Sequence, residues 1–233
     1  MIPIGDVNPR RSFPLATVGL ILLNLAVFAY QLSLTPEALE AFVASAAIIP
    51  RRIVGSADLA ATSSLVTAMF IHGGWMHLIS NMIFLWIFGD NVEDRLGVLP
   101  FLGVYLLTGL AASAAQIAID PTSSIPIVGA SGALSGIAGI YLVLFPRARV
   151  RVVVPILFLA RVVEVSALAF FAIWFLLQAV QGAADIGAMG EGGVAWFAHM
   201  GGFVAGVLVG LLARAGSRLV RPQAYDAGLH SHR

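Results

Sequence analysis

The stretch Val128-Gly-Ala-Ser-Gly-Ala-Leu-Ser-Gly-Ile-Ala-Gly139 places very small residues at the start of an apolar segment, with the hydroxyl of Ser131 near its beginning. Small residues allow a neighbouring helix or a substrate backbone to approach closely. The free N–H groups of a helix's first turn can also receive a developing negative charge. Small residues at this spacing commonly serve helix packing alone. Catalysis therefore requires that the rest of the chain supply a base and further donors at the same depth.

The composition indicates a membrane protein. Of the 233 residues, 59% are hydrophobic and 11% are charged, which is more apolar surface than one soluble core can bury. The net charge is +1 and no basic patch is interleaved with aromatic residues, which argues against nucleic-acid binding. Cysteine is absent, so disulfides, thiolate nucleophiles and cysteine metal ligands are excluded.

Six apolar runs approach the length of about 20 residues that a helix needs to cross a bilayer. The predicted spans are Leu15–Leu34, Trp75–Glu93, Phe101–Ile119, Ser131–Phe145, Val165–Val180 and Ala195–Ala213. The long segment between the first two contains short amphipathic pieces, which predict an interfacial outer loop. The predicted fold class is all-α, a polytopic bundle of six transmembrane helices. The predicted divisions are a cytoplasmic N-terminal segment, the membrane domain and a cytoplasmic basic tail, at residues 1–14, 15–213 and 214–233.

The arginines predict the orientation in the membrane, because cytoplasmic loops next to spans retain an excess of positive residues. Eleven of the 13 arginines fall on the side of both chain ends, and only Arg51 and Arg52 fall on the other. We therefore expect both termini in the cytoplasm. The segment Met1–Pro14 is not followed by a small-residue cleavage site, so we expect the first span to be retained. Spans two, four and six then begin at the outer face.

Polar residues open each of these three spans. Span two begins at His72-Gly-Gly-Trp-Met-His77, and Asn81 shares a helix face with His77 because the two are four residues apart. Span four begins with Ser131, and span six carries His199 in its first or second turn. At a rise of about 1.5 Å per residue, all these groups lie within a few turns of the outer surface. A polar group at that depth needs a partner or a function.

Small residues follow Ser131 every four positions, and glycines that start with Gly202 follow His199 every three or four. If these two stripes pack together, His199 can take the proton of the Ser131 hydroxyl during attack. His77, Asn81 and the backbone N–H of Ser131 can then form an oxyanion hole. No acidic residue lies near these positions in the sequence, so we predict a dyad without the orienting carboxylate of a triad.

The residues alone leave other functions open. Intramembrane histidines often bind haem or a metal, although the spacing of His72 and His77 does not match a helical zinc motif. Asn81 and Ser135 can also simply bridge helices, which is the role we expect for Ser135. A small transporter would place polar groups at this depth, but the span centres lack the carboxylates used in proton coupling. A protein of the same fold that only binds membrane helices is a further alternative.

Taken together, these motifs resemble those of the rhomboid intramembrane serine proteases, in their bacterial six-span form. The resemblance covers about Thr67 to Gly206. Its motif residues are His72, His77 and Asn81 in span two, Gly129-Ala-Ser131-Gly132 in span four, and Ala198-His199 with Gly202 in span six, supported by Gly89, Glu93 and Gly97. The fold that this resemblance implies is a rhomboid-like bundle of six helices with a long first outer loop.

The resemblance also implies roles for these residues. Ser131 would be the nucleophile and His199 the general base, with His77, Asn81 and the Ser131 backbone N–H as oxyanion donors. Supporting positions in the active site would be His72, Gly129, Gly132 and Gly202. The implied activity is hydrolysis of peptide bonds in or near transmembrane segments, without a cofactor or a metal, at a cavity open to the outer face.

The implied partners are transmembrane protein substrates and the lipid bilayer, and the implied location is a bacterial inner membrane. The chain departs from the family pattern in two places. Many members carry a Trp-Arg pair in the first outer loop, where this sequence reads Thr62-Ser-Ser-Leu65. Some members place a tyrosine beneath the histidine, one turn after the nucleophile, where this chain has Ser135.

Glu93 is expected to cap a helix or to bind a neighbouring one.

Overall fold

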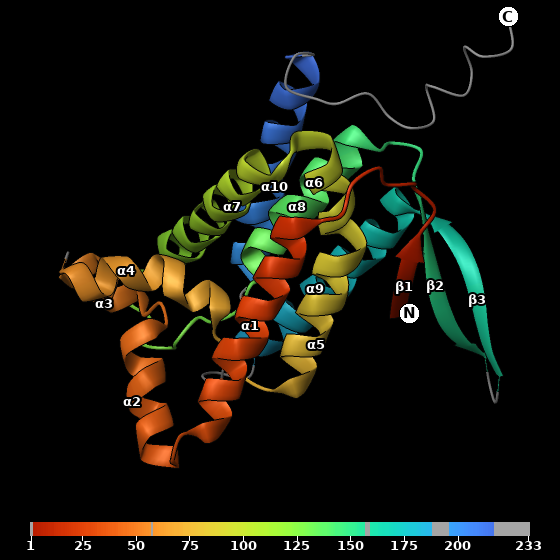
Figure 1. The fold of residues 1–233 in the computed structure, drawn as a ribbon. Helices are drawn as coiled ribbons and strands as arrows, with labels where there is room; N and C mark the ends of the chain where they lie inside the picture. Colours follow the sequence, from red (N-terminus) through yellow and green to blue (C-terminus); the bar gives the residue numbers. More distant parts are fainter. Residues whose placement is uncertain (1, 57, 157–158, 188–195, 217–233) are drawn as a thin grey trace, which may run out of the picture.

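Helices make up most of this computed structural model, which describes residues 2–56, 58–156, 159–187 and 196–216 (Figure 1). Residues 188–195, between the predicted fifth and sixth spans, and most of the predicted basic tail, at 217–233, lie outside the described residues. The helices before the central bundle are α1 (Leu15–Ser33), α2 (Pro36–Ala46), α3 (Pro50–Gly55), α4 (Leu59–Thr67) and the 3-10 turn η1 (Ala68–Phe70). Those that follow are α5 (Trp75–Phe84), the π-helical turn η2 (Leu85–Gly89), α6 (Asp90–Leu96), α7 (Val98–Ile119), α8 (Ser131–Leu144), α9 (Ala167–Gly187) and α10 (Trp196–Ala215).

Three of the described helices, α1, α7 and α10, are long and apolar enough to cross a membrane. A fourth candidate span arises if the bent pair Leu59–Phe70 and Trp75–Leu96, whose two parts meet at 77°, is counted as one. The helix α8 and the apolar part of α9, Ala167–Val180, are shorter. By length and composition the described chain therefore has three or four candidate spans, and the count of six stays a prediction.

The central contact of the bundle joins α8 to α10, whose backbones touch at glycines. A Cβ atom on Gly202 would lie 2.1 Å from the carbonyl oxygen of Gly132. One on Gly206 would lie 2.0 Å from the carbonyl oxygen of Gly136. In the other direction, a Cβ atom on Gly139 would lie 2.4 Å from a carbonyl oxygen of α10. The predicted packing of the two small-residue stripes is therefore present, and no side chain separates the two helices at these points.

The helix α7 packs on another side of α8. A Cβ atom on Gly136 would overlap the side chain of Thr108, at 2.2 Å, and one on Gly132 would lie 2.6 Å from Cβ of Ala112. The hydroxyl of Thr108 also donates a hydrogen bond to the carbonyl oxygen of Ala133, at 3.2 Å. Ser135 is fully buried and its hydroxyl donates to the Ser131 carbonyl oxygen at 2.8 Å, in keeping with the packing role expected for it.

An antiparallel sheet departs from the predicted all-α class. It consists of β1 (Ile2–Asp6), β2 (Arg149–Ile156) and β3 (Leu159–Ser166), in the order β1-β2-β3, and lies beside the helices (Figure 1). Its hairpin β2–β3 occupies the stretch expected to lead into span five, so Val165 is in a strand and α9 begins at Ala167. The physical reason is a run of β-branched valines, which favour extended strands.

The hairpin also shows the alternation of a sheet with one buried face. Val150 and Val152 are fully buried in the main hydrophobic core, whereas Arg149 and Arg151 are exposed. Both arginines lie within 3.9 Å of the Glu164 carboxylate on β3, in exposed ion pairs of the kind that contribute little to stability. The alternation of apolar and charged residues in this stretch is therefore the sequence pattern that indicates a strand pair.

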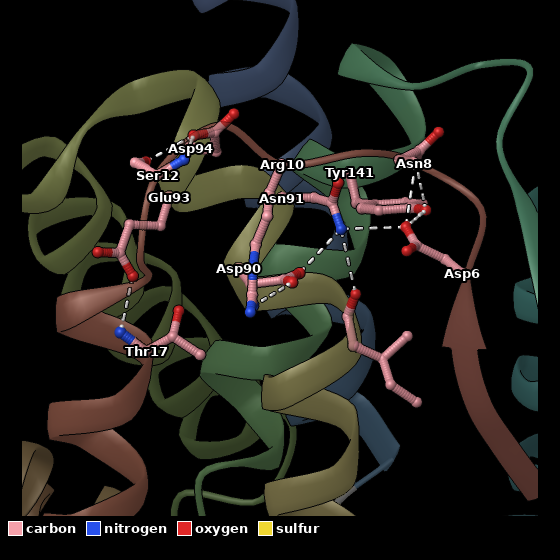
Figure 2. A network of polar contacts seen from close by, with 11 residues as sticks. Asp6, Asn8, Arg10, Ser12, Thr17, Asp90, Asn91, Glu93, Asp94 and Tyr141 are labelled. Atoms are coloured by element: carbon pink, nitrogen blue, oxygen red, sulfur yellow. Dashed lines mark hydrogen bonds and ion pairs between the residues drawn. The ribbon is translucent and has the colours of Figure 1, made fainter. Parts of the chain in front are cut away.

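The segment before α1 is held by carboxylates (Figure 2). The Asp6 carboxylate accepts hydrogen bonds from the Tyr141 hydroxyl at 2.5 Å and from the side-chain amides of Asn8 and Asn91 at 3.1 Å. These bonds tie β1 to α8 and α6. Burial raises the pKa of the Asp6 carboxyl, although each of these hydrogen bonds opposes that shift.

Glu93 of α6 fixes the start of α1 (Figure 2). Its buried carboxylate accepts the backbone N–H groups of Ala16 and Thr17, at 2.9 and 2.8 Å. These are first-turn N–H groups that have no partner within their own helix, and a negative charge there also suits the helix dipole. Glu93 is therefore both a cap and an inter-helix partner, as expected.

We predict that Gly206→Ala destabilises the protein by about 1–3 kcal/mol, because the added methyl group forces α8 and α10 apart. The measurement is thermal unfolding in detergent micelles. The matched control is Gly103→Ala on α7, where a Cβ atom meets nothing within 4 Å. That control should leave the melting temperature unchanged or raise it. Equal melting temperatures for wild type and Gly206→Ala would contradict the close backbone contact.

We predict a pH dependence of stability that originates at Asp6. Its carboxyl holds a proton more tightly in the folded protein, so the free energy of unfolding should fall as pH rises from the ordinary aspartate pKa of 3.8 through the raised folded value. Asp6→Asn should reduce this fall in a series of melting curves.

Asp58→Asn is the matched control with the opposite sign. The Asp58 carboxylate caps α4 by accepting the backbone N–H of Ala61 at 2.6 Å, which lowers the pKa of its carboxyl. Its stabilising effect should therefore be present at neutral pH and fade as pH falls. The same pH slope in Asp6→Asn and wild type would refute the assignment to Asp6.

Candidate active site

The structure brings Ser131 and His199 together. Ser131 is the first residue of α8, and its Oγ lies 2.7 Å from Nε2 of His199. His199 lies in the first turn of α10 and is buried, whereas Ser131 is partly exposed. The start of α10 is held by α7, where the Gln116 side-chain oxygen accepts the backbone N–H of Ala198 at 3.1 Å. The hydroxyl therefore faces an imidazole nitrogen that is fixed by the surrounding helices.

The other nitrogen of His199 has a partner that the sequence analysis did not identify. Nδ1 contacts the side-chain oxygen of Gln178 on α9. One turn earlier, the ring of Trp174 lies 5.6 Å from the His199 ring, with 36° between the planes. The one signal in the sequence was that Gln178 is the only amide or charged residue in the apolar run Ala167–Val180. Because both imidazole nitrogens are engaged, His199 has none left for a haem or a metal.

The backbone before Ser131 adopts a conformation that needs glycine. Gly129 has φ = +117°, and a Cβ atom there would lie 2.6 Å from Nε2 of His77 and 3.7 Å from Nδ2 of Asn81. The N–H of Gly129 donates to the carbonyl oxygen of Ala68 at 2.8 Å, which fixes this turn. Nitrogens of His77 and Asn81 therefore lie beside the chain that enters α8.

The first turn of α8 adds backbone donors. No side chain caps this helix. The N–H groups of a first turn have no partner within the helix and carry partial positive charge. The backbone N–H of Ser131 therefore belongs to a helix start that can receive negative charge.

His72 supports this side of the site. It is 1% exposed, and its Nε2 lies 3.0 Å from Nδ2 of Asn81. The side-chain amide of Gln31 on α1 binds the His72 backbone twice, donating to the carbonyl oxygen at 3.0 Å and accepting the N–H at 3.1 Å. Gln31 was also missed by the sequence analysis, although a buried amide in an apolar helix is a recognisable signal. This chain of contacts orients Asn81 from α1.

The predicted residues thus occupy one region of the molecule. This region contains the residues Ser131, His199, His77, Asn81, His72 and Gly129. The contact between α8 and α10 at Gly132 and Gly202 lies next to the Ser131–His199 pair. Within the described parts of the chain, no group of three histidine, cysteine or acidic side chains is arranged to hold a metal ion. A hydroxyl in contact with an imidazole, with N–H donors nearby, is an arrangement that can catalyse acyl transfer.

Comparison with known proteins identifies the family. Residues 60–216 match the model of the rhomboid domain family. The chain is 34% identical over 155 residues to Rhomboid-like protein 11, chloroplastic, of Arabidopsis thaliana, covering 64% of this chain and 52% of that protein. It is 33% identical over 151 residues to Rhomboid protein 1, mitochondrial, of Saccharomyces cerevisiae, covering 63% and 40%.

A shorter match is to the Putative rhomboid protease YdcA of Bacillus subtilis, 35% identical over 78 residues that cover 34% of this chain and 39% of that protein. The matched region thus spans about half the length of these relatives or less. The family model covers more than half of this chain and includes every residue of the site described above except Gln31. The chain belongs to the rhomboid family.

Proposed function

We propose that the protein is an intramembrane serine endopeptidase that cleaves peptide bonds in or near transmembrane segments of other membrane proteins. The observation that carries the proposal is the 2.7 Å contact between Ser131 Oγ and His199 Nε2. Protease names among the relatives, such as YdcA, give further support at the level of the family. The proposed reaction uses only side chains and backbone groups of this chain, with no cofactor.

In the proposed mechanism, Ser131 Oγ attacks the carbonyl carbon of the scissile bond while its proton moves to His199 Nε2. The oxyanion is stabilised by the Ser131 backbone N–H and by the side chains of His77 and Asn81. His199 then gives its proton to the leaving amine, and an acyl-enzyme remains on Ser131. Water attacks this ester as His199 takes the water proton, and the proton returns to Ser131 Oγ when the acid leaves.

The apolar candidate spans and the family place the protein in a lipid bilayer. We propose that six helices cross it, that both termini are cytoplasmic, and that the site opens toward the outer face. The resemblance to the bacterial six-span form implies a bacterial inner membrane. Family membership does not support that location, because the relatives matched over 155 and 151 residues are named as chloroplastic and mitochondrial proteins.

We predict that Ser131→Ala and His199→Ala abolish cleavage of a model single-span substrate by the purified protein in liposomes. Ser131→Ala removes the oxygen that attacks the carbonyl carbon, and His199→Ala removes the base that accepts the hydroxyl proton. Ser113→Ala is the matched control, because Ser113 is a buried serine on α7 whose hydroxyl donates to the Gly109 carbonyl oxygen of its own helix. Equal cleavage by wild type and Ser131→Ala would refute the serine mechanism.

A serine-directed phosphonate probe separates a protease from a protein that only binds membrane helices. We expect the probe to label wild type and Ser113→Ala but not Ser131→Ala. A wild type that retains the substrate without cleaving it and is not labelled would establish the binding function instead.

We predict that Asn81→Ala and His77→Ala each lower kcat by roughly 10²–10³ with little change in KM, the usual result of removing one oxyanion donor. Met76→Ala is the control, because that side chain is 78% exposed on the same helix. The kinetics would be measured on the same single-span substrate. An unchanged kcat in both variants would show that the oxyanion is held elsewhere.

A further inference from the structure

We propose that Gln178 is a positioning residue that selects the tautomer of His199 and holds its ring against Ser131. The proposal rests on the proposed protease function for its kinetic test and on the structure alone for its spectroscopic test. Its basis is the contact of the Gln178 side-chain oxygen with His199 Nδ1, on the side of the ring opposite Ser131.

The protons of the imidazole explain why this contact matters. A neutral imidazole carries one N–H, so Nε2 can accept the Ser131 proton only when Nδ1 holds the hydrogen. An N–H at Nδ1 requires an acceptor, because His199 and Gln178 are only 5% and 7% exposed and a buried donor without a partner is costly. The Gln178 side-chain oxygen is that acceptor. In the opposite tautomer Nε2 carries the hydrogen and donates it to the serine oxygen, so it cannot accept the proton of the hydroxyl.

An amide suits this position better than a carboxylate would. An ionised carboxylate buried in an apolar bundle costs several kcal/mol unless it is fully paired. The amide oxygen accepts the Nδ1 hydrogen without adding a charge. The dyad therefore has a third, neutral member in the place that an acidic residue holds in a triad.

The surroundings of Gln178 fix its direction. Trp174 lies one turn earlier on α9, so its ring and the Gln178 amide share a helix face and both meet His199. Phe175 holds α9 against α10, with its ring 4.6 Å from that of Phe203. The orientation of the base consequently depends on where α9 lies, because a displacement of α9 would remove the acceptor from Nδ1.

The kinetic test compares two substitutions of similar volume. Gln178→Met removes the acceptor and should lower kcat about tenfold or more with little change in KM. Gln178→Glu keeps an acceptor oxygen and should retain activity. Its negative charge stabilises imidazolium, so the acid limb of the kcat/KM profile should move to higher pH. His77 is the other titratable side chain near His199, so both profiles are repeated in His77→Gln.

Leu177→Met is the control variant, because Leu177 immediately precedes Gln178 on α9 and its side chain is 56% exposed. It should match wild type in kcat and melting temperature. The proposal is overturned if Gln178→Met keeps the wild-type kcat, or if Gln178→Met and Gln178→Glu lose activity equally with the same pH profile. The first result would indicate that Gln178 only fills space, because methionine has a similar volume.

The spectroscopic test does not depend on protease activity. Nitrogen NMR of histidine-labelled protein distinguishes the two tautomers, with His199→Ala used to assign the signal. We expect His199 to carry its hydrogen on Nδ1 in wild type and to lose this preference in Gln178→Met. Hydrogen on Nε2 in wild type would overturn the proposal. A wild type that shows the expected tautomer, but neither cleaves the substrate nor reacts with the phosphonate probe, would refute the protease function alone.

Discussion

The contact between the backbones of α8 and α10 is the constraint on which the site depends. Carbonyl oxygens of Gly132 and Gly136 occupy the space that side chains at Gly202 and Gly206 would need. Ser131 precedes the first of these glycines by one residue, and His199 precedes Gly202 by three. The glycine contact therefore sets the height and the separation at which hydroxyl and imidazole meet. In lipid such close approach is a main source of helix association, since apolar side chains gain little there.

Neutral amides organise the buried polar groups around this contact. Gln178 faces His199, Gln31 binds the backbone of His72, and Asn81 lies against the His72 ring. A buried polar group without a partner is expensive inside a bilayer, and a charged one is more so. An amide both donates and accepts without a charge, which explains how amide side chains can contact the rings of His72 and His199 without a carboxylate.

Carboxylates are used instead at the other end of α8. Tyr141 lies ten residues after Ser131, about 15 Å along the helix, and binds the Asp6 carboxylate. Glu93 caps α1 at the same end, where Asp90 also pairs with Arg10 at 3.1 Å (Figure 2). The helix α8, which carries Ser131, is thus anchored near its C-terminal end by the Asp6 carboxylate, whereas amide side chains lie around the histidines near its N-terminal end. The carboxylates of this network therefore lie far from the His199 imidazole, whose Nε2 would have to be unprotonated to act as a base.

The family, the starts of α5, α8 and α10, and the contact between Ser131 and His199 could all be predicted from the sequence, because apolar runs, motif spacing and glycine stripes can be recognised in it. The partners that lie far apart in the chain became known only from the folded structure. A single glutamine in an apolar run does not reveal which helix it will face, so Gln178 was missed. Strand pairing between Ile2–Asp6 and Val150–Val153 is equally non-local, and a valine-rich stretch satisfies a helix or a strand until its partner is known.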